Sequence, residues 1–159
     1  MQSLQTEQSD QIPIQNLTKA HIRYLLIEAL DQTQIDSETL EWVRSLCEEL
    51  STRIKNLTPN NIKFQREWDQ NFDIDLIIQM LKHNAFEEDD CQNLVSVVFE
   101  RLSKCCAPVQ DEAVAHAKEA VLREVKFSSK MACMIEIAHC ILEDIETLGK
   151  KFQESVDNS

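Results

Sequence analysis

Two groups of side chains in this sequence have residue types and spacings that occur in catalytic or metal sites. Cys105 and Cys106 are adjacent, and His116 follows ten residues after Cys106, so a cysteine nucleophile would have a candidate base on the following helix. Glu136 and His139 are three residues apart, which is the spacing of a helical di-iron ligand pair. The first question is therefore whether the sequence completes either kind of site.

The sequence lacks the further residues that a cysteine nucleophile or a di-iron site would need. The cysteine pair is not a CxxC motif, and no second pair with zinc spacing occurs. There is no second Glu-x-x-His motif, and a chain with one Gly cannot form a glycine-rich phosphate loop. We therefore expect no catalytic residue, no metal and no cofactor, and we interpret the cysteines as packed thiols.

Composition and charge indicate the fold class and disfavour several classes of binding partner. The 159 residues contain 43% hydrophobic residues, one Gly and three Pro, which predicts one domain of long helices. The formal charge of -12 disfavours binding to nucleic acid or to an anionic membrane surface, and it suits a basic partner. No stretch reaches the roughly 18 apolar residues of a membrane span, and the polar start is not a signal peptide. We expect an intracellular, cytoplasmic protein with free thiols.

Apolar periodicity predicts an all-α fold, an irregular bundle of about six to seven helices. The expected domain covers residues 16–153, between a flexible polar leader at 1–15 and a polar tail at 154–159. A break in the helical pattern is expected at residues 71–73, and the acidic run at 87–90 is expected at a helix N-terminus. The expected helix caps are Asp36 or Ser37, Asp73, Asp111, and Ser128 or Ser129.

The last expected helix is apolar on almost all sides. From Met131 to Leu142 only Glu136 and His139 are polar, and with Glu143 they are expected to form its one solvated stripe. A helix of this kind is buried on several sides, either at the centre of a bundle or at an interface with another chain. We expect homo- or hetero-oligomerisation through this helix. The candidate partner-facing residues are Met131, Met134, Ile135, Ile141, Leu142, Ile145, Leu148 and Phe152.

The stretch CCAPVQD resembles LCAPVRD, the most recognisable motif of the T-complex protein 11 family. The upstream stretch FDIDLIIQMLKHNAFEEDDCQNL is also similar to a family pattern, and the resemblance covers roughly residues 20–152. Gln110 stands where the family usually has Arg, so the corner keeps hydrogen bonding but loses a positive charge. The motif residues are Cys106, Ala107, Pro108, Val109, Gln110 and Asp111, and the matching upstream residues include Asp73, Asp75, Gln79 and His83.

The resemblance implies an all-helical protein without established catalytic chemistry. It also implies that this chain corresponds to about the first half of family members, which are linked to cAMP and protein kinase A signalling and to sperm and ciliary function. We interpret residues 106–109 as a helix stop and Asp111 as the cap of the next helix, with a docking surface beside this corner. The expected function is a non-enzymatic protein-interaction module: a regulatory or scaffolding adaptor, or a subunit of a larger assembly.

Three alternatives stay open from the sequence. The chain could be a minor structural component of a large viral particle that borrowed a host gene. It could be an acidic mimic of DNA, although its acidic residues are spread over helices and do not form phosphate-like rows. It could be a metal-dependent or cysteine-based enzyme, for which the candidate residues are His83, Cys91, Cys105, Cys106, His116, Glu136 and His139.

Overall fold

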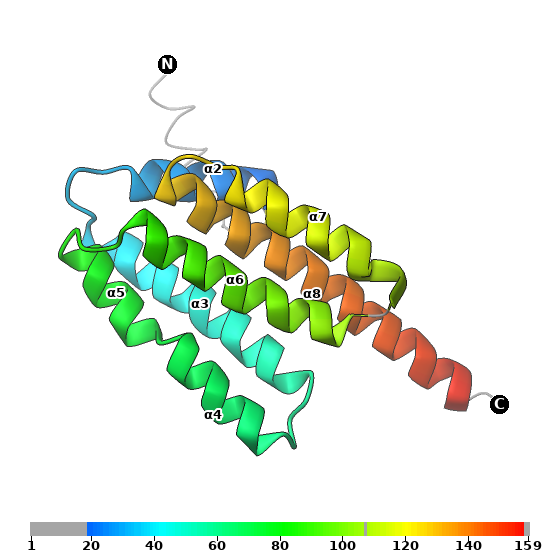
Figure 1. Cartoon of the computed structure of the whole chain (residues 1–159). Coiled ribbons are helices and arrows are strands. Elements are labelled where there is room, and N and C mark those ends of the chain that lie inside the picture. The colour runs from blue at the N-terminus through cyan, green and yellow to red at the C-terminus, as the bar shows by residue number, and fades with distance from the viewer. Residues whose placement is uncertain (1–18, 107, 158–159) are drawn as a thin grey trace, which may run out of the picture.

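The computed structural model describes residues 19–106 and 108–157 (Figure 1). The expected leader at 1–15 and the motif residue Ala107 lie outside these ranges. Within them there is no strand, and the prediction of an all-α bundle is confirmed. The elements are α2 (Lys19–Leu30), α3 (Ser37–Asn56), α4 (Ile62–Asn71), α5 (Ile74–Lys82), α6 (Glu88–Cys105), the short 3-10 helix η2 (Pro108–Gln110), α7 (Asp111–Leu122) and α8 (Phe127–Asp157).

Local capping chemistry sets the start of several helices. The Asp36 carboxylate accepts a hydrogen bond from the Thr39 backbone N–H at 2.8 Å, and Asp73 accepts one from Leu76 at 3.1 Å. Both predicted caps are confirmed, and the predicted break near residues 71–73 separates α4 from α5. Glu87 begins a capping box with Asp90, so the acidic run does lie at the N-terminus of α6.

The prediction that Ser128 or Ser129 caps the last helix is wrong. Helix α8 already begins at Phe127, because the Lys130 N–H donates to the Lys126 carbonyl at 3.0 Å and closes a turn that includes both serines. Ser128 is fully buried, and its hydroxyl donates to Asp31 at 2.6 Å. This serine therefore ties the start of α8 to the end of α2.

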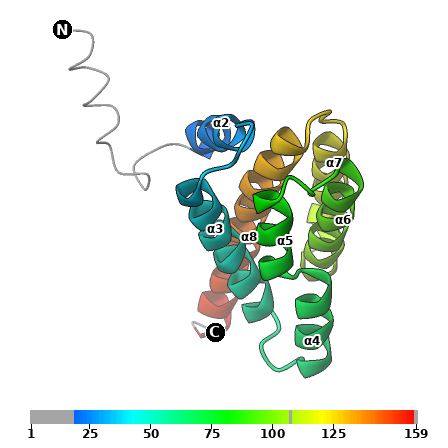
Figure 2. The ribbon, with the colours of Figure 1, turned by 90° about the vertical axis from the view of Figure 1, so that its left-hand side faces the viewer.

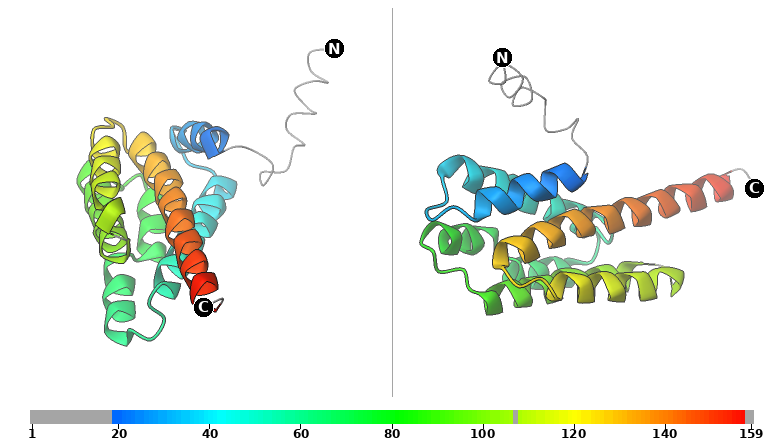
Figure 3. Two further views of the ribbon diagram at one scale, coloured as in Figure 1. Left: turned by 90° about the vertical axis from the view of Figure 1, so that its right-hand side faces the viewer. Right: turned by 90° about the horizontal axis from the view of Figure 1, so that it is seen from above.

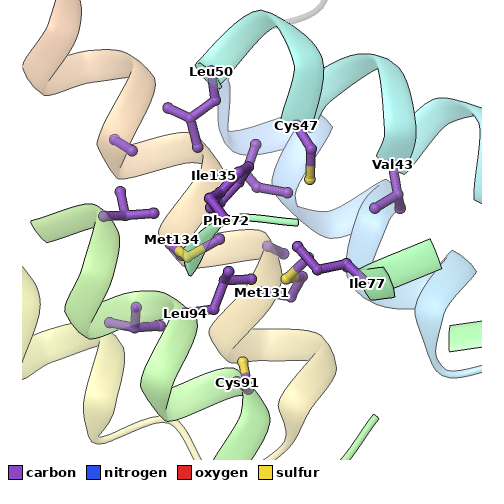
Figure 4. Packing of buried hydrophobic residues seen from close by; sticks show 14 of the residues in the cluster. Val43, Cys47, Leu50, Phe72, Ile77, Cys91, Leu94, Met131, Met134 and Ile135 are labelled. Carbon is purple, nitrogen blue, oxygen red and sulfur yellow. The ribbon is translucent and has the colours of Figure 1, made fainter. Parts of the chain in front are cut away.

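Helix α8 runs through the centre of the bundle and makes contacts with α2, α3, α6 and α7 (Figures 1 and 2). Met131, Met134, Ala138 and Leu142 have no exposed surface. Figure 4 shows Met131, Met134 and Ile135 among side chains from α3, α5 and α6. The helix continues through Asp157, so residues 154–157 of the expected tail are helical. None of the described helices is both long and apolar enough to cross a membrane.

Besides Ser128, the buried side chains of Trp68 and Lys130 each have a hydrogen-bond partner on another helix. The indole of Trp68 is 2% exposed, stacks on Phe72 with ring centroids 4.8 Å apart, and donates its Nε1–H to Ser51 at 2.7 Å. The side chain of Lys130 is 1% exposed, and its ammonium group donates to the Glu88 carboxylate at 2.8 Å. The first contact joins α4 to α3, and the second joins α8 to the start of α6.

Candidate functional site

The corner between α6 and α7 is held by a thiol. Cys106 Sγ donates to the Ser103 carbonyl at 3.3 Å and lies 3.1 Å from Asp111 Oδ1. The prediction that Asp111 caps α7 is wrong: the N-cap position is Gln110, which makes no side-chain cap bond. Because η2 leads directly into α7, Gln110 has helical dihedral angles, and the Asp111 carboxylate turns back to Cys106 instead.

The cysteines of the described residues are free thiols, and burial is the main cause of a raised pKa at several of them. Burial raises the pKa of Cys47 and of Cys91 to about 12. Burial, followed by the hydrogen bond to Asp111, raises the pKa of Cys106 to about 11. A reactive cysteine needs a thiolate near neutral pH, which these environments disfavour. His116 contacts Glu112 on its own helix at 3.5 Å, and no hydrogen bond of the described residues joins it to Cys106.

The Asp111 contact gives a testable prediction for Cys106. Replacing Asp111 with Asn removes the negative charge beside the thiol, so the pKa of Cys106 should fall and its alkylation at pH 7.5 should become several-fold faster. Peptide mass spectrometry after timed iodoacetamide treatment measures the rate at each cysteine. Glu112→Gln is the matched control on the same helical turn. An unchanged rate at Cys106 in Asp111→Asn would mean that the carboxylate does not control this thiol.

The upstream motif residues lie along and around α5. Asp73 caps this helix, and the exposed Asp75 forms an ion pair with Arg44 of α3 at 2.7 Å. The Gln79 carbonyl accepts a hydrogen bond from the His83 backbone N–H at 3.1 Å, where the helix ends, and both side chains are exposed. These residues define the bounds of α5 and connect it to α3, so their observed contacts are structural.

A partly open pocket of about 230 Å³ lies between α2, α3 and α8. Its apolar wall comes from Ile22 and Leu26 of α2, Leu46 of α3 and Ile135 of α8, and its polar lining includes Glu136, His139 and Glu143. The sequence pattern predicts that these three polar residues form one solvated stripe. That interpretation is wrong for Glu136, whose side chain is 11% exposed and paired with Arg23.

Two arginines that the sequence analysis did not single out organise this pocket. Arg23 donates to Glu136, and this bond raises the pKa of the guanidinium. Arg53 contacts His139 Nδ1 at 2.8 Å and is paired with Glu146, which raises its pKa in the same way. Glu136 and Glu146 are therefore engaged by cations of other helices. No group of three or more metal-binding side chains occurs in residues 19–106 and 108–157.

A family model described as T-complex protein 11 matches residues 3–148. The chain belongs to the T-complex protein 11 family. The matched range includes the corner at Cys106–Asp111, the α5 residues and the arginine-lined pocket. It also includes most of residues 1–15, which the sequence analysis separated as a leader. No curated protein and no solved structure matches the chain.

The match to the T-complex protein 11 family ends within α8, which continues for nine residues to Asp157. The right-hand view in Figure 3 shows this end of α8 extending past the other helices. The expectation of a partner-facing surface needs correction for Met131, Met134, Ile135 and Leu142, because the chain's own helices bury all four. They are buried because α8 lies at the centre of the bundle and packs against α2, α3, α6 and α7, of which α2 and α3 are distant from it in the sequence. Ile141 and Ile145 are half-buried and Leu148 is 44% exposed, while the side chain of Phe152 is outside the described part.

Proposed function

We propose that this chain is a non-enzymatic protein-interaction module whose partner packs along the C-terminal end of α8. The observation that carries the proposal is the apolar stripe that leaves the core along this helix. Its side chains change from half-buried at Ile141 and Ile145 to 44% exposed at Leu148 and 50% exposed at Val156. Exposed apolar side chains at helical spacing are typical of surfaces that bind another helix.

The charges beside this stripe define the chemistry of the partner. Residues 143–157 contain five acidic and two basic residues, a net charge of -3, in a chain whose formal charge is -12. A partner helix with an apolar face and basic flanks therefore complements this surface. A second copy of the chain carries the same negative charge and is opposed by repulsion. The acidic residues are Glu143, Asp144, Glu146, Glu154 and Asp157, and the basic ones are Lys150 and Lys151.

The state of the chemically reactive groups supports a binding role over an enzymatic one. The Cys106 thiol at the family corner has a pKa of about 11, raised first by burial, and is therefore protonated near neutral pH. The Glu136 carboxylate of the candidate di-iron pair is occupied by Arg23. We therefore propose a regulatory or scaffolding adaptor that acts in the settings to which the family is linked, cAMP and protein kinase A signalling and sperm and ciliary function.

Leu148→Asp tests this proposal. The change places a charge in the centre of the proposed contact, so partner binding should weaken by at least about tenfold, which corresponds to the roughly 1.5–3 kcal/mol of burying one Leu side chain. The matched control is Val125→Asp, because Val125 is 83% exposed on another part of the surface. The wild type, Leu148→Asp and Val125→Asp are each purified by affinity from native cells. Quantitative mass spectrometry then measures which proteins each of them retains.

The expected result is a set of proteins retained by the wild type and Val125→Asp but lost from Leu148→Asp. Retention of the same set by Leu148→Asp would contradict the proposed surface. Light scattering over a concentration series distinguishes the second copy as occupant. A dimer that Leu148→Asp dissociates would overturn the proposal of a basic partner and make this surface a self-association site.

A further inference from the structure

A second pocket lies between α4 and α6, on the part of the molecule where α4 forms the lower corner in Figure 2. It has a volume of about 310 Å³ and is mainly polar. Lys63 of α4 and Arg101 and Lys104 of α6 line it, together with Glu67 and Glu100. Three cations and two carboxylates give this pocket a formal charge of +1 on a chain whose total is -12. The local excess of positive charge is thus opposite in sign to the whole protein.

Arg101 differs from the other half-buried arginines among the described residues. Arg23, Arg44 and Arg53 each form an ion pair with a carboxylate. No carboxylate of the described residues forms an ion pair with Arg101, Lys63 or Lys104, even though Glu67 and Glu100 line the same pocket. A half-buried cation without an anionic partner bears a desolvation cost that an anion offsets.

The contacts of Arg101 hold its guanidinium group in place but leave one of its N–H donors without an acceptor. One Nη donates to the Thr58 hydroxyl, and the plane lies over the Phe64 ring, with Cζ 3.4 Å from the ring centroid. The Nε–H is buried and has no hydrogen-bond acceptor among the described residues. A positioned guanidinium with unused donors matches the geometry that oxyanions require, because phosphate and carboxylate groups accept two parallel hydrogen bonds from one arginine.

We propose that this pocket binds a small oxyanion, a phosphate or carboxylate group, through Arg101 with Lys63 and Lys104. Arg101 supplies the oriented hydrogen bonds, and the two exposed lysines supply further charge at the rim. Phe64 and the buried Trp68 form the apolar wall against which the ligand's remaining atoms lie. This site is separate from the C-terminal end of α8, so it does not depend on the proposed partner surface.

NMR titration of the full chain tests the site directly. The reporters are the Nε–H signal of Arg101 and the indole N–H signal of Trp68, and the indole of Trp42 is an internal control because Trp42 does not line the pocket. The probes are inorganic phosphate and sodium acetate, each compared with sodium chloride at equal ionic strength. We expect saturable shifts of Arg101 and Trp68 with phosphate, acetate or both, and the stronger probe identifies which oxyanion is preferred.

Two substitutions separate binding from folding. Arg101→Gln should weaken oxyanion binding by at least about tenfold, because it removes the charge-assisted hydrogen bonds. Lys104→Gln removes an exposed charge and keeps the Arg101 contacts, so it should fold normally and still weaken binding several-fold. Arg66→Gln is the control, since Arg66 is exposed on α4 and does not line the pocket. Shifts no larger than those with chloride, or equal affinity in all three variants, would overturn the proposal.

Discussion

Replacing Trp68 with alanine should lower the free energy of unfolding by about 3–5 kcal/mol. The indole is 2% exposed and stacks on Phe72 at 4.8 Å, so the substitution leaves a large cavity between α3, α4 and α5. It also removes the hydrogen bond to the hydroxyl of Ser51, a residue that is 8% exposed. A buried hydroxyl that loses its partner adds to the cost of the cavity.

Urea denaturation followed by far-UV circular dichroism measures this effect, with the slope as a check on two-state behaviour. Trp42→Ala is the matched control, because Trp42 is half-buried and only packs against the edge of the core. Trp68→Phe keeps most of the ring volume and should cost less than Trp68→Ala. Equal losses for Trp68→Ala and Trp42→Ala would contradict the central role of the Trp68 cluster.

Removing Glu88 should destabilise the protein more than replacing Lys130, although both changes break the same ion pair. Glu88→Ala removes the carboxylate from Lys130, whose side chain is 1% exposed in the wild type, and this should cost about 1–3 kcal/mol. The expected cost is at the low end for a buried charge because Glu88 is 60% exposed and solvent screens the pair. Lys130→Met removes the buried charge and fills its volume, so it should be nearly neutral or stabilising.

Thermal and urea unfolding of the single variants and the double variant measure the coupling. Asp89→Ala is the matched control, since Asp89 also lies in the acidic first turn of α6 and has no ion pair in the described ranges. It reports the loss of a favourable charge at the helix N-terminus alone. Greater destabilisation by Lys130→Met than by Glu88→Ala would contradict the interpretation that the buried ammonium depends on Glu88.

The features that the sequence predicted correctly depend on short-range chemistry. Asp36 and Asp73 cap helices because their carboxylates reach a backbone N–H three residues away, which a sequence pattern records directly. The acidic first turn of α6 and the apolar periodicity of α8 are likewise visible in the local sequence, although the sequence does not show which helices pack against α8. Asp111 shows the limit: its sequence context suits a cap, but the 3-10 turn before it leaves no N-cap position for its side chain.

The features that the sequence did not predict depend on contacts between distant segments. Arg23 and Glu136 are 113 residues apart, and Arg53 and Glu146 are 93 apart, so no spacing rule connects them. The sequence around Arg101 contains one weak indication of partial burial: this charged residue directly precedes the buried Leu102 and lies at the edge of an apolar stripe. Its importance appears only when α4 places Phe64 and Lys63 beside it.

The acidic end of α8 has a consequence for the dynamics of this helix. Its last turn contains Glu154 and Asp157 and no basic residue, so negative charge lies at the negative end of the helix macrodipole. Without lateral packing, such a segment opens at a small free-energy cost, and amide hydrogen exchange should become faster from Met131 toward Asp157. A cationic helix bound there would reverse this electrostatic penalty, so association and the slowing of exchange would be thermodynamically linked.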